Sequence, residues 1–341
     1  MVESKETKFW ERVNHYVHRL YDEVESYSPQ TAGDPPPAHV VSDLVHRDEL
    51  QVLGVGEPSE GNGEDREEKD WFYEDELENS HPLDGKGLFV RRLSHASKEG
   101  TAAGLADLAF RLDLDSVFLQ VGWHENGREN GHTAFQHDLE VVHALRENTG
   151  CKVVAWFYPW RGLEVQVLDN LRRWLDVVKF DVDAVLVNAE KGYYASSSSQ
   201  VGKVNDQAAS LVHELRQLVD APLGLSSYPI AAWHPRFAWE GFSTLDFGCP
   251  QVYDTNQTLG PNFPRQAVES YSALFGGRHK VFPTFGASSA HTAQQMRDRL
   301  SRTPICPGVS WWDAHHLRYS NSRQEVVRSY AWPEVREEKQ Q

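Results

Sequence analysis

Residues 180–194 hold the side chains most suited to acid–base chemistry. Their sequence is FDVDAVLVNAEKGYY, an apolar run that ends in an amide, a carboxylate and two tyrosines. With the alternation of a β-strand, Leu186, Asn188 and Glu190 share one face, and the other face is aliphatic. The segment is therefore predicted to be a buried strand whose C-terminal end carries Asn188 and Glu190, after which Gly192 lets the chain turn away. The alternative is that Glu190 only caps or salt-bridges the start of a loop.

The elements that must position these residues alternate regularly after Gly85. Short apolar runs are separated by segments of helical periodicity, such as LEVVHALRENTG and DQAASLVHELRQLV. The predicted strands are Leu88–Leu93, Ser116–Gly122, Lys152–Tyr158, Ala184–Glu190, Leu223–Tyr228, Phe247–Tyr253, Lys280–Phe285 and Gly308–Trp312. Eight strand-then-helix units predict an α/β fold, a (β/α)₈ TIM barrel with an N-terminal helical and acidic extension. A doubly wound open sheet is the alternative, but no GxGxxG turn follows the first strand.

Aromatic and carboxylate side chains dominate the predicted strand ends, which in such a barrel converge on one mouth. Indole and phenol rings stack on the apolar faces of sugar rings, and amides and carboxylates bind hydroxyl groups. The inventory therefore favours a carbohydrate ligand over a phosphate ester, although some tryptophans must serve packing alone. The predicted substrate-binding residues are Tyr253, Trp312, Gln251, Tyr228, Trp123, Tyr158 and Asp313.

Three motifs resemble those of family-18 chitinase-like glycosidases. Asp183 and Glu190 match the first and last residues of the DxxDxDxE signature, in which Leu186 and Asn188 replace the second and third aspartates. QVYD at 251–254 resembles the motif of the sixth strand, and GVSWW at 308–312 resembles the eighth. The N-x-E pattern is also similar to the D-x-E of family-25 muramidases. The resemblance spans residues 86–332 and implies a glycoside hydrolase acting on a glycan, N-acetylated in the family-18 case.

The resemblance also implies roles for single residues. Glu190 would be the proton donor, Tyr253 and Asp254 would line the reacting sugar, and Trp312 would be its hydrophobic floor. Asn188 stands where the family has an aspartate that steadies a developing positive charge, and a neutral amide cannot balance that charge. Glu190, Asp254 and Asn188 are thus the predicted catalytic set, with Asp313 as another source of a second carboxylate. The alternative that these replacements leave open is a non-catalytic glycan-binding or scaffold barrel.

Histidines near the loops raise a second alternative, a metal-dependent hydrolase. Arg91 and Arg92 stand where an amidohydrolase-type barrel would place an H-x-H pair, and His315 and His316 would point to opposite sides of an extended segment. We therefore predict neither a metal site nor a cofactor.

Composition sets the remaining expectations. The 341 residues are 40% hydrophobic and carry a formal net charge of −16, which argues against a nucleic-acid partner. No apolar run is long enough to cross a membrane and no secretory signal is evident, so a cytoplasmic location is the expectation. The three cysteines show no metal-ligand spacing and are predicted to be buried thiols.

The predicted organisation has four parts. Residues 1–27 form an amphipathic helix, which docks on the barrel or supports self-association, and 28–85 form an acidic linker or wrapping arm rich in Pro and Gly. Eleven acidic and two basic residues lie between Glu57 and Glu78. The barrel follows at 86–332, and a charged tail ends the chain at 333–341.

Overall fold

The computed structural model describes residues 81–98, 100–125, 128–129, 139–179, 181–253, 259–288 and 291–330. The predicted amphipathic helix, nearly all of the acidic linker and the charged tail lie outside the described residues. Within the described part no helix is long and apolar enough to cross a membrane.

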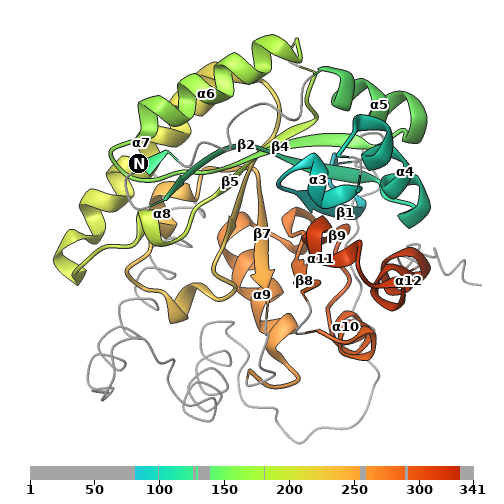
Figure 1. The fold of residues 1–341 in the computed structure, drawn as a ribbon. Coiled ribbons are helices and arrows are strands. Elements are labelled where there is room, and N and C mark those ends of the chain that lie inside the picture. Colours follow the sequence, from blue (N-terminus) through green and yellow to red (C-terminus); the bar gives the residue numbers. More distant parts are fainter. Residues whose placement is uncertain are drawn as a thin grey trace, which may run out of the picture. The chain divides into compact units, whose positions relative to one another are not determined.

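Eight parallel strands close into a barrel, which confirms the predicted fold class (Figure 1). They are β1 (Gly85–Val90), β2 (Ser116–Glu125), β4 (Lys152–Tyr158), β5 (Ala184–Asn188), β6 (Leu223–Ser227), β7 (Phe247–Val252), β8 (Thr284–Gly286) and β9 (Gly308–Trp312). Closure comes from β1, which pairs in parallel with both β2 and β9. The short β3 (Arg128–Glu129) pairs antiparallel with the end of β2.

Two strands depart clearly from their predicted bounds. The first was expected over Leu88–Leu93, but β1 spans Gly85–Val90. The other is β8. It was expected over Lys280–Phe285, but it begins at Thr284. A 3₁₀ turn, η5 (Arg278–Lys280), occupies the start of the predicted segment. Pro283, directly before the strand, has no amide hydrogen to donate to a neighbouring strand.

Helices cover the outside of the barrel. They are α3 (Leu93–Ala96), α4 (Ala102–Leu112), α5 (Leu139–Thr149), α6 (Glu164–Val177), α7 (Val201–Leu218), α8 (Trp239–Phe242), α9 (Phe263–Phe275), α10 (Ala293–Leu300), α11 (Ala314–Leu317) and α12 (Asn321–Ser329). Local sequence sets several ends: Thr292 and Gln295 form a capping box on α10, and Gly276 ends α9 in the left-handed conformation.

Two hydrophobic layers follow from the alternation along each strand. An inner cluster fills the barrel with side chains that include Phe89, Phe118, Trp156 and Leu186. A larger outer cluster joins the other strand faces to the helices. All three cysteines are buried and free, as predicted. Leu186, which replaces an aspartate of the family-18 signature, is therefore part of the packed barrel interior.

Three aspartates join neighbouring strands at the N-terminal end of the barrel, which we call the bottom. Each lies directly before a strand, and its carboxylate accepts a hydrogen bond from a residue at the start of the preceding strand, whose carbonyl accepts the aspartate's own N–H. The pairs are Asp115 with Lys86, Asp183 with Val153, and Asp246 with Leu223, with donor–acceptor distances of 2.7–2.8 Å. We call these reciprocal pairs the aspartate clamps.

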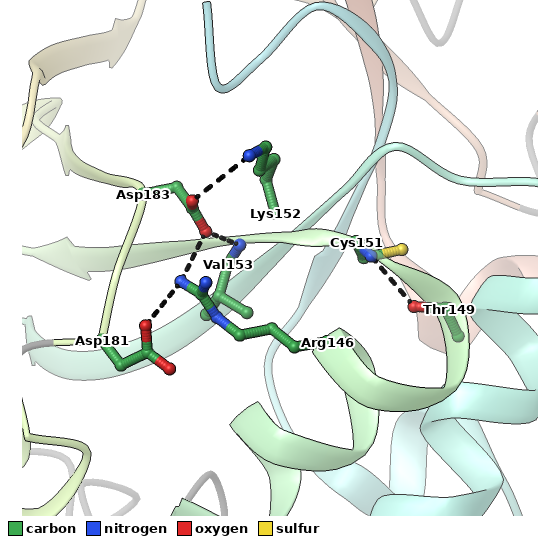
Figure 2. Close-up of polar contacts among 7 residues, drawn as sticks. All are labelled: Arg146, Thr149, Cys151, Lys152, Val153, Asp181 and Asp183. Atoms are coloured by element: carbon green, nitrogen blue, oxygen red, sulfur yellow. Dashed lines mark hydrogen bonds and ion pairs between the residues drawn. The ribbon is translucent and has the colours of Figure 1, made fainter.

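Cations balance two of the clamps. Arg146 contacts Asp183 at 2.9 Å, and Lys152 approaches it at 3.8 Å (Figure 2). Arg216 donates two hydrogen bonds of 2.7 Å to Asp246. Asp183, the first residue of the family-18 signature, thus lies at the opposite end of β5 from Glu190 and ties strands together.

His81 packs among the barrel residues at the bottom. Its ring stacks on Phe282 at 4.5 Å between centroids and meets Phe247 edge-on at 4.9 Å. Nδ1 accepts a hydrogen bond from the amide of Leu83, a member of the inner cluster. Burial lowers the pKa of His81 to about 4, a shift that the charge of Asp246 partly opposes.

Candidate functional site

Glu190 lies two residues beyond the end of β5, at the C-terminal end of the barrel, which is the mouth. The strand delivers Asn188 as its last residue, and the 3₁₀ turn η2 (Lys191–Tyr193) starts directly after Glu190. Gly192 is required here by close approach, because a Cβ at this position would lie 2.9 Å from the carbonyl oxygen of Pro159. The chain therefore turns tightly against the end of β4 and leaves Glu190 half-buried.

Gln251 on β7 connects the two predicted catalytic side chains of β5. Its Nε2 donates to Oδ1 of Asn188 and to Oε1 of Glu190, each at 2.8 Å, and lies 3.4 Å from the Ser226 hydroxyl. Asn188 and Gln251 are buried. The structure thus brings together the amide and the carboxylate that strand alternation placed on one face, and holds the carboxylate by a neutral amide.

Aromatic rings border this group on the β9 side. Trp312, half-buried at the end of β9, lies 5.3 Å from both Phe89 and Trp156 and 6.3 Å from Tyr253, between ring centroids. Burial raises the pKa of the Tyr253 hydroxyl, and the charges of Glu190 and Asp313 raise it further. Tyr253 therefore stays protonated near neutrality as a neutral neighbour of the carboxylates.

A second aromatic group stands beyond β6. Tyr228 stacks on His234 with 3.9 Å between ring centroids, and Tyr194 meets Tyr228 edge-on at 6.0 Å. Burial raises the pKa of Tyr228, and the charge of Glu190 adds to the shift. Burial also lowers the pKa of His234 to about 4, so its ring is neutral at pH 7. Tyr228 was predicted from the sequence, whereas Tyr194 and His234 were not, because the contact between them joins loops that follow two different strands.

Asp313 is buried directly after Trp312, to which a cis peptide bond links it. Its side chain caps α11 by accepting a hydrogen bond of 3.3 Å from the amide of His316. A charge at Asp313 raises the pKa of Tyr253, so the two side chains lie near each other, and Asp313 also has a capping role that the sequence did not reveal.

The other predicted site residues divide into two groups. Asp254 and the side chain of Trp123 lie outside the described residues. Tyr158 is buried at the end of β4, one strand away from Asn188. Among the described carboxylates of the mouth, Glu190 and Asp313 are the two that reach Tyr253 electrostatically.

The histidines predicted to be extended lie in a helix instead. His315 and His316 are in α11, with 5.2 Å between their ring centroids. Over the described residues no group of three His, Cys, Asp or Glu side chains is arranged to hold a metal ion.

No protein-family model and no curated sequence matches the chain. Solved structures match its fold. The β-glycosidase BGL167 aligns with a TM-score of 0.50 and 10% identity, over 68% of this chain and 86% of its own. A GH18 chitinase from Pseudoalteromonas aurantia aligns at 0.48 and 12%, over 72% and 100%. A xylanase and α-amylase inhibitor protein from Scadoxus multiflorus aligns at 0.47 and 13%, over 72% and 97%. At these identities the likeness shows the fold alone, a TIM barrel like that of glycoside hydrolases.

Proposed function

We propose that the protein is a glycoside hydrolase that cleaves a glycan at the barrel mouth, with Glu190 as the general acid. The observation that carries the proposal is the hydrogen-bonded group of Glu190, Gln251 and Asn188, beside the exposed part of Trp312. The group offers a proton donor and amide hydrogen-bonding groups, and the indole offers a stacking surface for a sugar ring.

An N-acetylated sugar is the substrate class that suits this group best. Glu190 would give its proton to the glycosidic oxygen as the bond to the anomeric carbon breaks and its electron pair leaves with that oxygen. The acetamide oxygen of the substrate would then bond to the anomeric carbon, as in substrate-assisted glycosidases. Water would open this intermediate and return a proton to Glu190. Such a route needs no second protein carboxylate as nucleophile.

Asn188 does not supply the negative charge that this route would use. It therefore supports a second candidate function, a barrel that binds glycans without cleaving them. The Asn188 amide can orient an acetamide group but cannot balance the charge that develops on it. Leu186 beneath it is packed in the barrel interior and supplies no charge either. A missing electrostatic partner of this kind costs about 10²- to 10³-fold in rate, so slow turnover is expected.

Replacement of Glu190 tests the proposal. The wild type should release product from chromogenic N-acetylglucosaminides or peptidoglycan fragments, and Glu190→Gln should lower the rate by about 10³-fold, since general-acid catalysis contributes about 10²- to 10⁴-fold. The melting temperature should stay within about 2 °C of the wild type, because glutamine can still accept the hydrogen bond from Gln251.

Two outcomes would reject the enzyme. If the wild type binds chitooligosaccharides but forms no product, the non-cleaving barrel is the better description. If Glu190→Gln retains full turnover and melts several degrees lower, Glu190 is a structural residue.

A further inference from the structure

Gln120 on β2 is a buried amide that the proposed function does not use. Its neighbours Leu119 and Val121 belong to the outer cluster, whereas Phe118 belongs to the inner one. Strand alternation therefore turns the side chain of Gln120 into the barrel, on the mouth side of Phe118.

Gln120 belongs to the layer of interior side chains at the mouth. In barrels of this kind each interior layer takes one side chain from every second strand. Counted around the closed sheet, β2, β5, β7 and β9 are such a set of alternate strands (Figure 1). The inward side chains nearest the mouth on these strands are Gln120, Asn188, Gln251 and Trp312.

Burial supports this depth for Gln120. Gln120 and Gln251 are 8% and 9% exposed, whereas Trp156 in the interior below is wholly buried. Gln120 is also the register partner of Trp156 on β4, whose ring lies 5.3 Å from that of Trp312 between centroids. Gln120 therefore lies at the floor of the mouth, close to the surface on which a sugar ring is proposed to stack.

The Gln120 amide holds a donor that the described part of the chain leaves unpaired. Its Nε2 is buried and has no hydrogen-bond partner among the described residues. Gln251 differs, because its Nε2 donates to Asn188 and Glu190. A buried N–H without an acceptor costs free energy, so a ligand oxygen that reached it would be bound favourably. The last torsion of a glutamine side chain is broad, and rotation about it turns either amide atom toward the mouth.

The place of Gln120 in the barrel indicates which part of a sugar it would meet. β2 lies opposite β7, so Gln120 and Gln251 face each other across the mouth. In a pyranose ring, the carbon that carries an acetamide lies across from the carbon that carries the hydroxymethyl group. A ring that stacks on Trp312 with its acetamide at Asn188 would therefore extend its hydroxymethyl group toward Gln120.

We propose that Gln120 is a specificity-determining residue that binds the hydroxymethyl oxygen of the sugar, so that a hexose derivative is preferred over its 6-deoxy counterpart. The inference rests on the proposed function for the orientation of the ring, but it concerns binding and does not require cleavage. A hydroxyl group both donates and accepts, so it can pair with either atom of the amide. A site built around such a bond discriminates against an analogue that leaves its buried polar group unpaired.

Matched sugars test the contact without any change in the protein. NMR titration measures the affinity of the wild type for methyl N-acetyl-β-glucosaminide and for its 6-deoxy and 4-deoxy analogues. The 6-deoxy sugar should bind about fivefold more weakly than the parent sugar, a difference that one neutral hydrogen bond can supply.

Variants assign this difference to Gln120. Gln120→Met should lower the affinity for the parent and 4-deoxy sugars by about fivefold and leave the affinity for the 6-deoxy sugar unchanged. The melting temperature should not fall, because methionine has a similar shape and leaves no unpaired donor. Gln207→Met is the matched control: Gln207 on α7 also has a buried side-chain atom without a described partner, but it lies outside the barrel. This variant should bind all three sugars like the wild type.

The outcomes separate this inference from the proposed function. Equal affinity of the wild type for the parent and 6-deoxy sugars, or an equal loss for both in Gln120→Met, would overturn the inference. No binding of any of the three sugars would also overturn it, while the assay with Glu190→Gln still decides whether the protein is an enzyme. A preference for the parent sugar that depends on Gln120, without cleavage of any glycan, would reject the enzyme and support the contact.

Discussion

The two ends of β5 use carboxylates in opposite ways. At the bottom, Asp183 accepts a backbone hydrogen bond from Val153 and is balanced by Arg146 and Lys152 (Figure 2). At the mouth, Glu190 is held by the neutral amide of Gln251 and is near buried aromatic rings. Asp183 thus joins β5 to β4 through a backbone amide, whereas Glu190 is linked to β7 through a side-chain amide. One end of β5 therefore carries a carboxylate that joins strands, and the other end carries the carboxylate proposed to be the general acid.

Loss of the bottom carboxylate should have the largest effect on stability. Asp183→Ala removes the acceptor for Val153 and leaves Arg146, which also contacts Asp181, without its better buried partner. We expect a loss of about 3 kcal/mol in the free energy of unfolding, as for removing one partner of a largely buried pair. Urea unfolding measures this loss. Equal stability of Asp183→Ala and the wild type would show that the carboxylate at the bottom of β5 does not stabilise the barrel.

Removal of the Trp312 indole should have the next largest effect, a loss of affinity for glycans. Trp312→Ala deletes the indole that lies between Phe89, Trp156 and the open mouth. We expect affinity for chitooligosaccharides to fall about 30-fold or more, since central aromatic residues of a binding site are worth about 2 kcal/mol. Calorimetry measures the affinity, and Trp174→Phe, in the buried face of α6, is a control that should bind normally.

A negative charge added at the mouth should raise the activity. Asn188→Asp places an anion beside Glu190 and Gln251, where it can balance the charge on a reacting acetamide. Activity on N-acetylated substrates should rise by about tenfold, a fraction of what such a group is usually worth. An unchanged or lower rate would speak against the substrate-assisted route and for chemistry built on Asp254 or Asp313.

Low pH should destabilise the folded barrel through His81, which lies at its bottom. The pKa of His81 is about 4 in the folded chain and near 6.5 when unfolded, so the unfolded chain binds the proton first as the pH falls. The stabilisation is complete above pH 6.5 and is lost between pH 6.5 and 4. Asp84, whose pKa burial raises, opposes this loss at the acid end of the range.

Replacing His81 by a residue that does not titrate tests its contribution to the pH dependence of stability. His81→Gln should be less stable than the wild type at pH 8, because the stacking on Phe282 is lost, but its melting temperature should fall less between pH 7 and 4.5. An equal fall in both proteins would mean that other groups, such as His234, dominate the acid sensitivity.

The sequence predicted the parts of the fold that depend on local pattern. Apolar runs bounded by turns located β4 and β9 at their observed limits, and alternation placed Asn188 and Glu190 on one face. It failed for β8, where a 3₁₀ turn and Pro283 shorten the strand. The family-18 signature includes both Asp183 and Glu190, but the five-residue strand β5 lies between them and places them at opposite ends of the barrel.

Contacts between loops that are distant in the sequence could not be predicted from it. Tyr194 and His234, and likewise His95 and His315, meet because barrel closure brings together segments that no local periodicity relates. The aspartate clamps did leave a signal, since Asp115, Asp183 and Asp246 each stand directly before a predicted strand, although a repeat of one residue type is too short to detect as an internal repeat.

The aspartate clamps also decide where the barrel tolerates rearrangement. Each clamp joins strands that follow each other along the chain: β1 to β2, β4 to β5, and β6 to β7. A circular permutant opened between β5 and β6 keeps the two members of every clamp within one continuous stretch. One opened between β4 and β5 sends Val153 and Asp183 to opposite ends of the new polypeptide, so the barrel divides most naturally at the junctions that no clamp spans.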